Sequence, residues 1–174
     1  MGAVRIALPA LLLVTSCAPA AKPVASPATP TGDVGSTGVE QPPAALEVSG
    51  WREWKKSNPR RFRSKGHGYL WVDVHVHASH AEMYGDRSKP TPVGFAVAMA
   101  GYETADATEP TGLTVMAKMP PGYDPENGDW YYAIFDAAGK SATLGGKLAP
   151  CTGCHIHARP RDFLFGVAAK EEAP

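Results

Sequence analysis

The chain has 174 residues, and its 17 Lys and Arg residues balance its 17 Asp and Glu residues, so its formal net charge is zero. A neutral chain without a long basic run lacks the electrostatic attraction that binding to nucleic acid requires, which excludes that class of partner. The chain is long enough for one domain of ordinary size once two N-terminal segments are set aside.

Residues 1–16 have the features of an export signal. Arg5 precedes an apolar run over residues 6–14, which is too short for a membrane-spanning helix of about 20 residues. Small residues then lead to Cys17 in a pattern that resembles a bacterial lipobox, in which the cysteine is acylated and becomes the mature N-terminus. The alternative is an ordinary signal-peptidase site, with Cys17 removed or free. We expect an exported protein that is anchored to the membrane by a lipid on Cys17 and faces the periplasm or the cell exterior.

Residues 17–46 are rich in Pro and Ala and contain almost no large apolar side chains. Such a segment cannot bury enough surface to offset the entropy lost on ordering, so we expect a flexible tether. A degenerate leader without a role would have the same composition. The folded domain is predicted to span residues 47–174.

The first elements of this domain are predicted to be a short helix and a strand. Trp51 and Trp54, with the basic residues after them, fit an amphipathic helix that ends at an Asn-Pro pair. The Gly-His-Gly sequence of residues 66–68 indicates a turn. Residues 69–77 alternate between aliphatic side chains and polar or aromatic ones, as in a strand with one face in the core. A short helix is expected over residues 78–86.

Three further apolar runs with the character of strands follow, over residues 93–102, 113–119 and 130–136. Turn-forming residues separate them at a spacing that is typical of hairpins. Gly145 and Gly146 are expected to begin the approach to the cysteines that follow. We therefore expect an α+β domain, built on a mainly antiparallel β-sheet with a few short helices.

The segment 151–155 reads Cys-Thr-Gly-Cys-His, which is the C-x-x-C-H signature of covalent haem c attachment. Cys151 and Cys154 are spaced to reach the two vinyl groups on one edge of the porphyrin and form thioethers. The adjacent His155 then lies under the iron and supplies the proximal imidazole. The sequence therefore predicts one covalently attached haem c, with His155 as the metal ligand.

Three other interpretations of the cysteine pair remain open. A redox disulfide would suit a thioredoxin-like context, which this chain lacks. A zinc site would need His155 and His157 as the second ligand pair, in an awkward arrangement because His155 directly follows Cys154. A structural disulfide would close a short, strained ring. The count of three cysteines favours haem, because one suits lipidation and two suit haem.

The other histidines allow several roles. His75 and His77 share one face of the predicted strand, and His80 follows. They could form a solvated polar strand face, place His75 or His77 on the distal side of a haem, or bind a separate metal ion. His157 is expected near the haem edge. Three methionines could supply a sixth ligand, although strand methionines are more often core residues: Met99, Met116 and Met119.

Several segments together resemble the cytochrome P460 family and its relatives, the β-type cytochromes c′. The segments are Val-Gly at 93–94, Leu-Thr-Val-Met-Ala-Lys at 113–118, Gly-Asp-Trp-Tyr-Tyr-Ala at 128–133, the motif at 151–155, and Arg-Asp-Phe-Leu-Phe at 161–165. The resemblance extends over residues 50–166, nearly the whole predicted domain.

The resemblance implies a β-rich fold, commonly dimeric, so a homodimer is expected. It also implies one high-spin haem whose distal side is open. Cys151 and Cys154 correspond to the thioether residues of the family and His155 to its proximal ligand. Some members oxidise hydroxylamine, and others bind nitric oxide without turnover.

One feature of the hydroxylamine-oxidising members has no counterpart here. Those enzymes carry a lysine, just after the first long strand, that is cross-linked to the porphyrin, and residues 78–84 of this chain contain no lysine. The nearest is Lys89. A carboxylate that could act as a base is placed only by position, at Glu82 or Glu103.

Three hypotheses follow from the sequence. The first is an exported mono-haem cytochrome that binds a small gaseous or nitrogenous ligand such as nitric oxide, transfers electrons with an unidentified redox partner, or does both. The second is a haem enzyme that oxidises hydroxylamine or detoxifies a reactive nitrogen species. The third is an exported domain without haem that binds metal or has a structural role.

Overall fold

The structure of the chain is a computed structural model, and it describes residues 39–43, 46–84 and 90–166. The predicted export signal, Cys17 and most of the predicted tether lie outside these residues, as does Lys89. Within the described part, no helix has the length and apolar character needed to cross a membrane.

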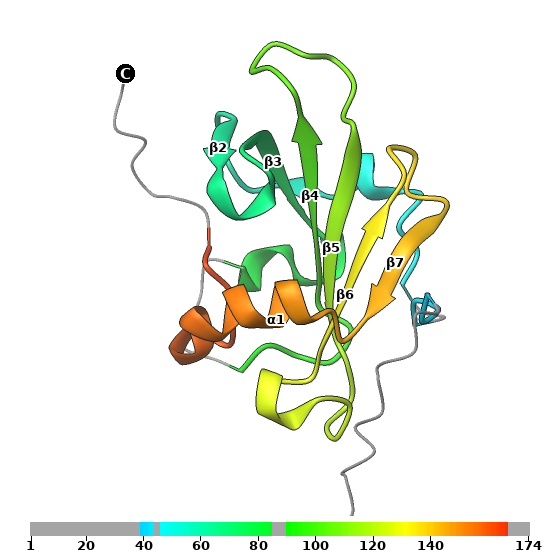
Figure 1. The fold of residues 1–174 in the computed structure, drawn as a ribbon, viewed down its shortest axis with the longest axis vertical. Helices are drawn as coiled ribbons and strands as arrows, with labels where there is room; N and C mark the ends of the chain where they lie inside the picture. The colour runs from blue at the N-terminus through cyan, green and yellow to red at the C-terminus, as the bar shows by residue number, and fades with distance from the viewer. Residues whose placement is uncertain (1–38, 44–45, 85–89, 167–174) are drawn as a thin grey trace, which may run out of the picture. The chain divides into compact units, whose positions relative to one another are not determined.

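The domain is built on a seven-stranded sheet in the order β1-β3-β4-β5-β6-β7, with β2 also paired to β3 (Figure 1). Every neighbouring pair is antiparallel. The strands are β1 Lys55–Lys56, β2 Phe62–Ser64, β3 Leu70–Val76, β4 Ala96–Tyr102, β5 Gly112–Lys118, β6 Trp130–Phe135 and β7 Ala142–Gly146. The five strands from β3 to β7 form a meander, because each is paired to the next along the chain.

Helical structure in the described residues is short. The one α-helix, α1, comprises Ala149–His155 and crosses one face of the sheet (Figure 1). The 3-10 helices are η1 Trp51–Glu53, η2 Lys65–His67, η3 Ala78–Met83, η4 Pro125–Asn127 and η5 Ile156–Arg161. The prediction of an α+β domain on an antiparallel sheet is confirmed.

Both faces of the sheet are buried. One face packs against the segment around Trp51 and Trp54. The other packs against Phe163 and Leu164, which follow α1. A strand that is covered on both sides has no solvated face. This explains why Asp73 and His75, on the face of the predicted strand that alternation assigned to polar residues, are only 4% and 9% exposed.

Two local predictions differ from the structure. The helix expected from Trp51 onward is a single 3-10 turn, and the chain then extends into β1, where Lys55 and Lys56 pair with β3. Strand β7 was not predicted, since Gly145 and Gly146 weaken a strand pattern. Their small size is required, because a Cβ on Gly145 would lie 2.4 Å from the hydroxyl of Tyr131.

Glu40, which falls inside the predicted tether, lies against the edge of β7. Its backbone N–H donates to the carbonyl of Gly145 at 3.2 Å, and its carbonyl accepts a hydrogen bond from the Tyr131 hydroxyl at 2.9 Å. Its carboxylate accepts another from Tyr123 at 2.9 Å. The chain therefore contacts the sheet before residue 47.

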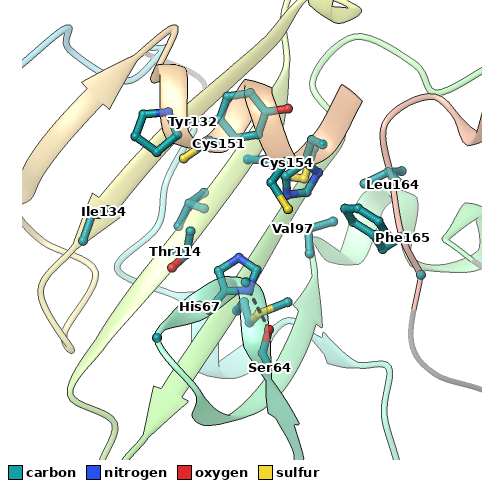
Figure 2. A pocket seen from close by; sticks show the side chains of 18 of the residues that line it. Ser64, His67, Val97, Thr114, Tyr132, Ile134, Cys151, Cys154, Leu164 and Phe165 are labelled. Carbon is teal, nitrogen blue, oxygen red and sulfur yellow. Dashed lines mark hydrogen bonds between the residues drawn. The ribbon is translucent and has the colours of Figure 1, made fainter. Parts of the chain in front are cut away.

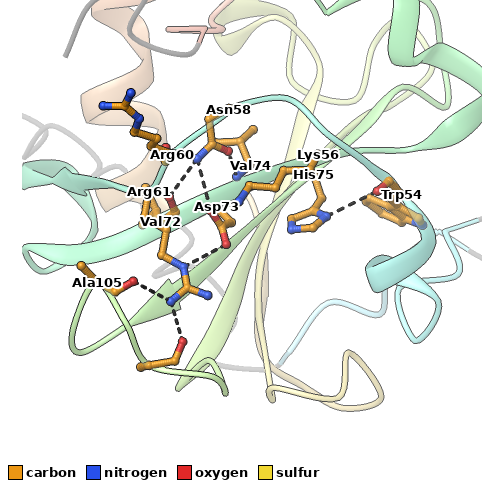
Figure 3. Close-up of polar contacts among 11 residues, drawn as sticks. Trp54, Lys56, Asn58, Arg60, Arg61, Val72, Asp73, Val74, His75 and Ala105 are labelled. Carbon is orange, nitrogen blue, oxygen red and sulfur yellow. Dashed lines mark hydrogen bonds and ion pairs between the residues drawn. The ribbon is translucent and has the colours of Figure 1, made fainter.

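A buried carboxylate fastens the segment after η1 to β3 (Figure 3). Asp73 forms ion pairs with Lys56 at 2.8 Å and with Arg61 at 2.9 Å. The Arg61 guanidinium also stacks on the ring of Tyr102, 3.4 Å from its centroid. Asn58 accepts a hydrogen bond from the backbone N–H of Val74 at 2.7 Å. These contacts hold the segment that leads into β2 and η2 against β3.

Candidate functional site

A cavity of about 570 Å³ lies between the sheet, α1, the η2 turn and the chain around Phe165 (Figure 2). Its volume is within the range of small-molecule and cofactor pockets. The sheet contributes one face of β4, β5 and β6, where Val97, Met99, Met116 and Ile134 make an apolar wall. The described residues that line the cavity include no Lys, Asp or Glu.

Helix α1 brings both cysteines to this cavity. Leu148 occupies the N-cap position, without a side-chain hydrogen bond. Pro150 lies in the first turn, where the missing N–H costs nothing. Residues three apart share a side of a helix, so Cys151 and Cys154 both line the cavity. Both are free thiols, so the disulfide interpretation is not realised in this structure. Burial, with a smaller contribution from Cys154, raises the pKa of Cys151 and keeps its thiol protonated.

His155 is held in one tautomer. Its Nδ1 lies 2.7 Å from the backbone carbonyl oxygen of Phe163. A carbonyl can only accept a hydrogen bond, so Nδ1 carries the proton and Nε2 keeps its lone pair. Burial lowers the pKa of His155, although the bond to Phe163 opposes the shift. A neutral imidazole whose second nitrogen is anchored by a backbone carbonyl has the form that metal ligands require.

The Phe163 carbonyl is positioned by a corner of unusual backbone conformation. Asp162 and Phe163 are both left-handed, with φ of 49° and 62°. Lys118 donates to both carboxylate oxygens of Asp162, at 2.7 and 2.9 Å, and the indole N–H of Trp130 donates to its carbonyl at 3.1 Å. Two strands of the sheet thereby hold the corner that orients His155. No local pattern in residues 161–165 predicts this role, and only the resemblance to the family draws attention to them.

Tyr132 lines the same cavity, although its hydroxyl is enclosed by protein. The residue is 1% exposed, and among the described residues its hydroxyl is the one fully buried side-chain polar atom without a hydrogen bond. Burial is the main cause that raises the pKa of Tyr132. A hydroxyl that water does not reach is also out of reach of a group bound in the cavity. The volume, the two free thiols and the neutral imidazole together fit a haem attached at α1.

The structure does not bring His75, His77 or His80 to the cavity. His75 lies on the opposite face of the sheet, with its ring edge-on to Trp51 at 4.9 Å and its Nδ1 3.4 Å from the carbonyl of Trp54. His77 packs against the Trp54 ring at 5.0 Å, and both His77 and His80 are hydrogen-bonded to Ser79. The solvated-face interpretation is therefore wrong for His75, because η1 and Trp54 cover it.

No group of three or more His, Cys, Asp or Glu side chains that could hold a metal ion occurs in the part of the chain described. The separate metal site proposed for the three histidines and the zinc interpretation of the cysteine pair therefore find no support. His157 is exposed and does not line the cavity.

Of the remaining residues predicted to serve as ligands or bases, two line the cavity and three do not. Met99 and Met116 line it, whereas Met119 packs against the other core. Glu82 is exposed and paired with Lys55 at 2.7 Å, and Glu103 is exposed after β4, so neither carboxylate reaches the cavity.

His67 is the residue of the cavity that the sequence did not single out. It lies on the η2 turn, and its Nδ1 is 2.7 Å from the hydroxyl oxygen of Ser64. Burial, and to a smaller extent His155, lowers the pKa of His67. The glycines on either side of His67 predict a turn, but nothing local in the sequence indicates that this turn faces α1.

Comparison with models of protein families identifies the family of the chain. The family model described as Cytochrome P460 matches residues 48–166 of the chain. The matched region contains all of the strands, α1 and the cavity. No curated protein matches the chain.

Proposed function

The chain belongs to the cytochrome P460 family, whose members are haem proteins, and from that premise we propose that it is an exported mono-haem c-type cytochrome. In this proposal Cys151 and Cys154 form the thioethers and His155 is the proximal ligand. The observation that carries it is the convergence of both thiols and a neutral, anchored imidazole on one cavity.

The haem would supply an iron centre that takes small ligands and electrons. The protein's own residues would hold and orient the haem. His155 keeps its proton on Nδ1 and presents Nε2, and the Phe163 carbonyl fixes the plane of its ring. The apolar side chains of β4, β5 and β6 would give the porphyrin a nonpolar surface on the sheet side of the cavity.

We propose that the haem binds a small ligand such as nitric oxide and exchanges electrons with an unidentified redox partner, rather than oxidising hydroxylamine. The described lining has neither a lysine for a porphyrin cross-link nor a carboxylate for a base. Its apolar character supports the binding of a small, weakly polar ligand.

Export and a lipid on Cys17 complete the proposal. The support is the pattern of residues 1–17 in the sequence together with the motif itself, because c-type haem is attached outside the cytoplasm.

Covalent attachment can be tested on the full chain produced with a cytochrome c maturation system. We expect the wild type to keep haem through denaturing electrophoresis, with a mass increase of one haem. The double variant Cys151→Ser/Cys154→Ser should lose the haem stain, because no thioether can form. Cys17→Ser is the matched control and should keep the stain. A wild-type protein without covalent haem would leave a non-haem domain as the better hypothesis.

The choice between ligand binding and hydroxylamine oxidation needs a second measurement on the same protein. We expect the haem peptide to carry no lysine cross-link, the ferrous Soret band to show no red shift, and nitric oxide to bind without hydroxylamine turnover. Turnover accompanied by a cross-linked lysine would instead establish the enzyme.

A further inference from the structure

The cavity has a second imidazole, His67, on the wall opposite to α1 (Figure 2). We propose that His67 is the distal residue of the haem site and donates a hydrogen bond from Nε2 to a small ligand held on the side of the haem away from His155. The inference rests on the proposed function, because it requires haem at α1.

The position of His67 follows from the way η2 faces the helix. Cys151 and Cys154 lie on the α1 side of the cavity, and the His67 ring points into the space from the opposite side (Figure 2). Gly66 brings the turn close to the attachment edge, since a Cβ there would lie 3.7 Å from the sulfur of Cys154. The turn that carries His67 therefore lies beside the edge at which a planar group would be attached to α1.

The hydrogen bond to Ser64 sets the direction of the His67 ring, and the serine hydroxyl can be either its donor or its acceptor. Ser64 Oγ and His67 Nδ1 are 2.7 Å apart, and Ser64 Oγ has no other hydrogen-bond partner in the described structure. If the hydroxyl donates its proton to Nδ1, it is satisfied and the imidazole proton remains on Nε2. Burial lowers the pKa of His67, which favours this neutral form. Nε2–H is then a donor without a partner among the described residues.

The other polar side chains of the cavity are less suited to this role. The Tyr132 ring lies 5.3 Å from the ring of His155, on the proximal side. Thr114 belongs to the sheet wall, where it pairs with Met99 and Ile134. Tyr84 also lines the cavity, with its ring stacked on Phe95 at 6.4 Å. The other lining side chains are mainly apolar, and a donor aimed at the ligand makes a stronger hydrogen bond in a medium of low polarity. His67→Leu removes the donor, His67→Gln keeps one, and Thr114→Val is the matched control.

The experiment uses the haem-loaded full chain, with haem content checked for each variant. In the ferrous carbonyl complex a donor near the ligand lowers the C–O stretching frequency. We expect His67→Leu to raise this frequency in the infrared spectrum, while His67→Gln stays near the wild type and Thr114→Val leaves it unchanged. For cyanide on the ferric protein, the Kd of His67→Leu should rise about fivefold to tenfold, which is the loss of about one hydrogen bond.

Three results would overturn the inference while leaving covalent haem intact. One is an unchanged C–O stretch and cyanide affinity in His67→Leu. Another is a change of the C–O stretching frequency in Thr114→Val but not in His67→Leu. The third is a low-spin, bis-histidine spectrum of the wild type that is lost in His67→Leu, which would make His67 a ligand instead of a donor. Absence of covalent haem from the wild type would overturn the proposed function, and this inference with it.

Discussion

At the scale of single residues, the site depends on one backbone carbonyl. The Phe163 carbonyl accepts a hydrogen bond from His155 Nδ1–H, and a left-handed corner that Lys118 and Trp130 hold through Asp162 directs this carbonyl. A ligand imidazole becomes more basic when its other nitrogen donates a hydrogen bond. In the proposed haem site the sheet would act on the iron ligand through Asp162, Phe163 and His155, although Lys118 itself does not line the cavity.

Removing the ammonium group of Lys118 tests this chain of contacts. Lys118→Met removes the cation paired with the Asp162 carboxylate, which is 28% exposed and keeps its hydrogen bonds to Thr91. We expect the corner to loosen, the bond from His155 to weaken and the reduction potential of the haem to rise in a redox titration. The free energy of unfolding should fall by about 1–3 kcal/mol. Lys147→Met, at an exposed lysine over the Tyr123 ring, is the control. An unchanged potential in Lys118→Met would contradict the proposed coupling.

At the scale of elements, the distal wall of the cavity depends on how β2 and η2 are fastened to β3. Asp73 contributes through its pairs with Lys56 and Arg61 (Figure 3). Burial by itself would raise the pKa of Asp73, but the hydrogen bonds and charges of the two cations outweigh it and lower the pKa. The ionised carboxylate is therefore favoured in the folded protein.

The stabilisation that Asp73 contributes depends on pH. A carboxyl whose folded pKa lies below its unfolded value of about 3.9 stabilises the protein fully above that pH, and this stabilisation is lost as the pH falls through the folded pKa. We expect Asp73→Asn to lower the free energy of unfolding at pH 7 by roughly 1–3 kcal/mol, with the difference from wild type closing below about pH 4. Urea unfolding across this range measures it.

Glu82→Gln is the control for that series, because the Glu82 side chain is 91% exposed in its pair with Lys55. Exposed ion pairs contribute little, so its unfolding should follow the wild type at every pH. A difference between Asp73→Asn and wild type that persisted unchanged at pH 3 would show that Asp73 does not act through its charge.

At the scale of the whole molecule, the domain and its attachment to a membrane are separate features. The described domain is one sheet with both faces covered, and Glu40 is hydrogen-bonded to the edge strand β7. The proposed anchor is Cys17, in the part of the chain that precedes this domain. The two features should therefore be separable by mutation.

Cys17→Ser tests that separation. We expect the variant to lose incorporation of labelled fatty acid and to move from the membrane fraction to the soluble fraction, because the acylated residue is absent. Its haem content should equal that of the wild type. A variant that stayed with the membrane fraction would show that something other than a lipid on Cys17 holds the protein there.

Most of the sheet could be predicted from the sequence. The predicted strands at 69–77, 93–102, 113–119 and 130–136 correspond to β3, β4, β5 and β6, because β-branched and aromatic residues in short runs between turns are a local signal. Strand β7 was missed because its glycines are selected by the approach of Tyr131, a contact that no local pattern contains.

The sequence by itself identified the family and predicted the chemistry of attachment. Two thiols and an imidazole within five consecutive residues are close in any fold, so the motif at 151–155 could be recognised without a structure. Only the tertiary structure decided which other histidine faces them. Alternation placed His75 and His77 on one face of a strand, but whether that face meets the cavity depends on what covers it, and Trp51 and Trp54 do. His67 reaches the wall opposite α1 because the meander from β3 to β7 brings η2 and α1 to the same face of the sheet, across more than eighty residues of chain.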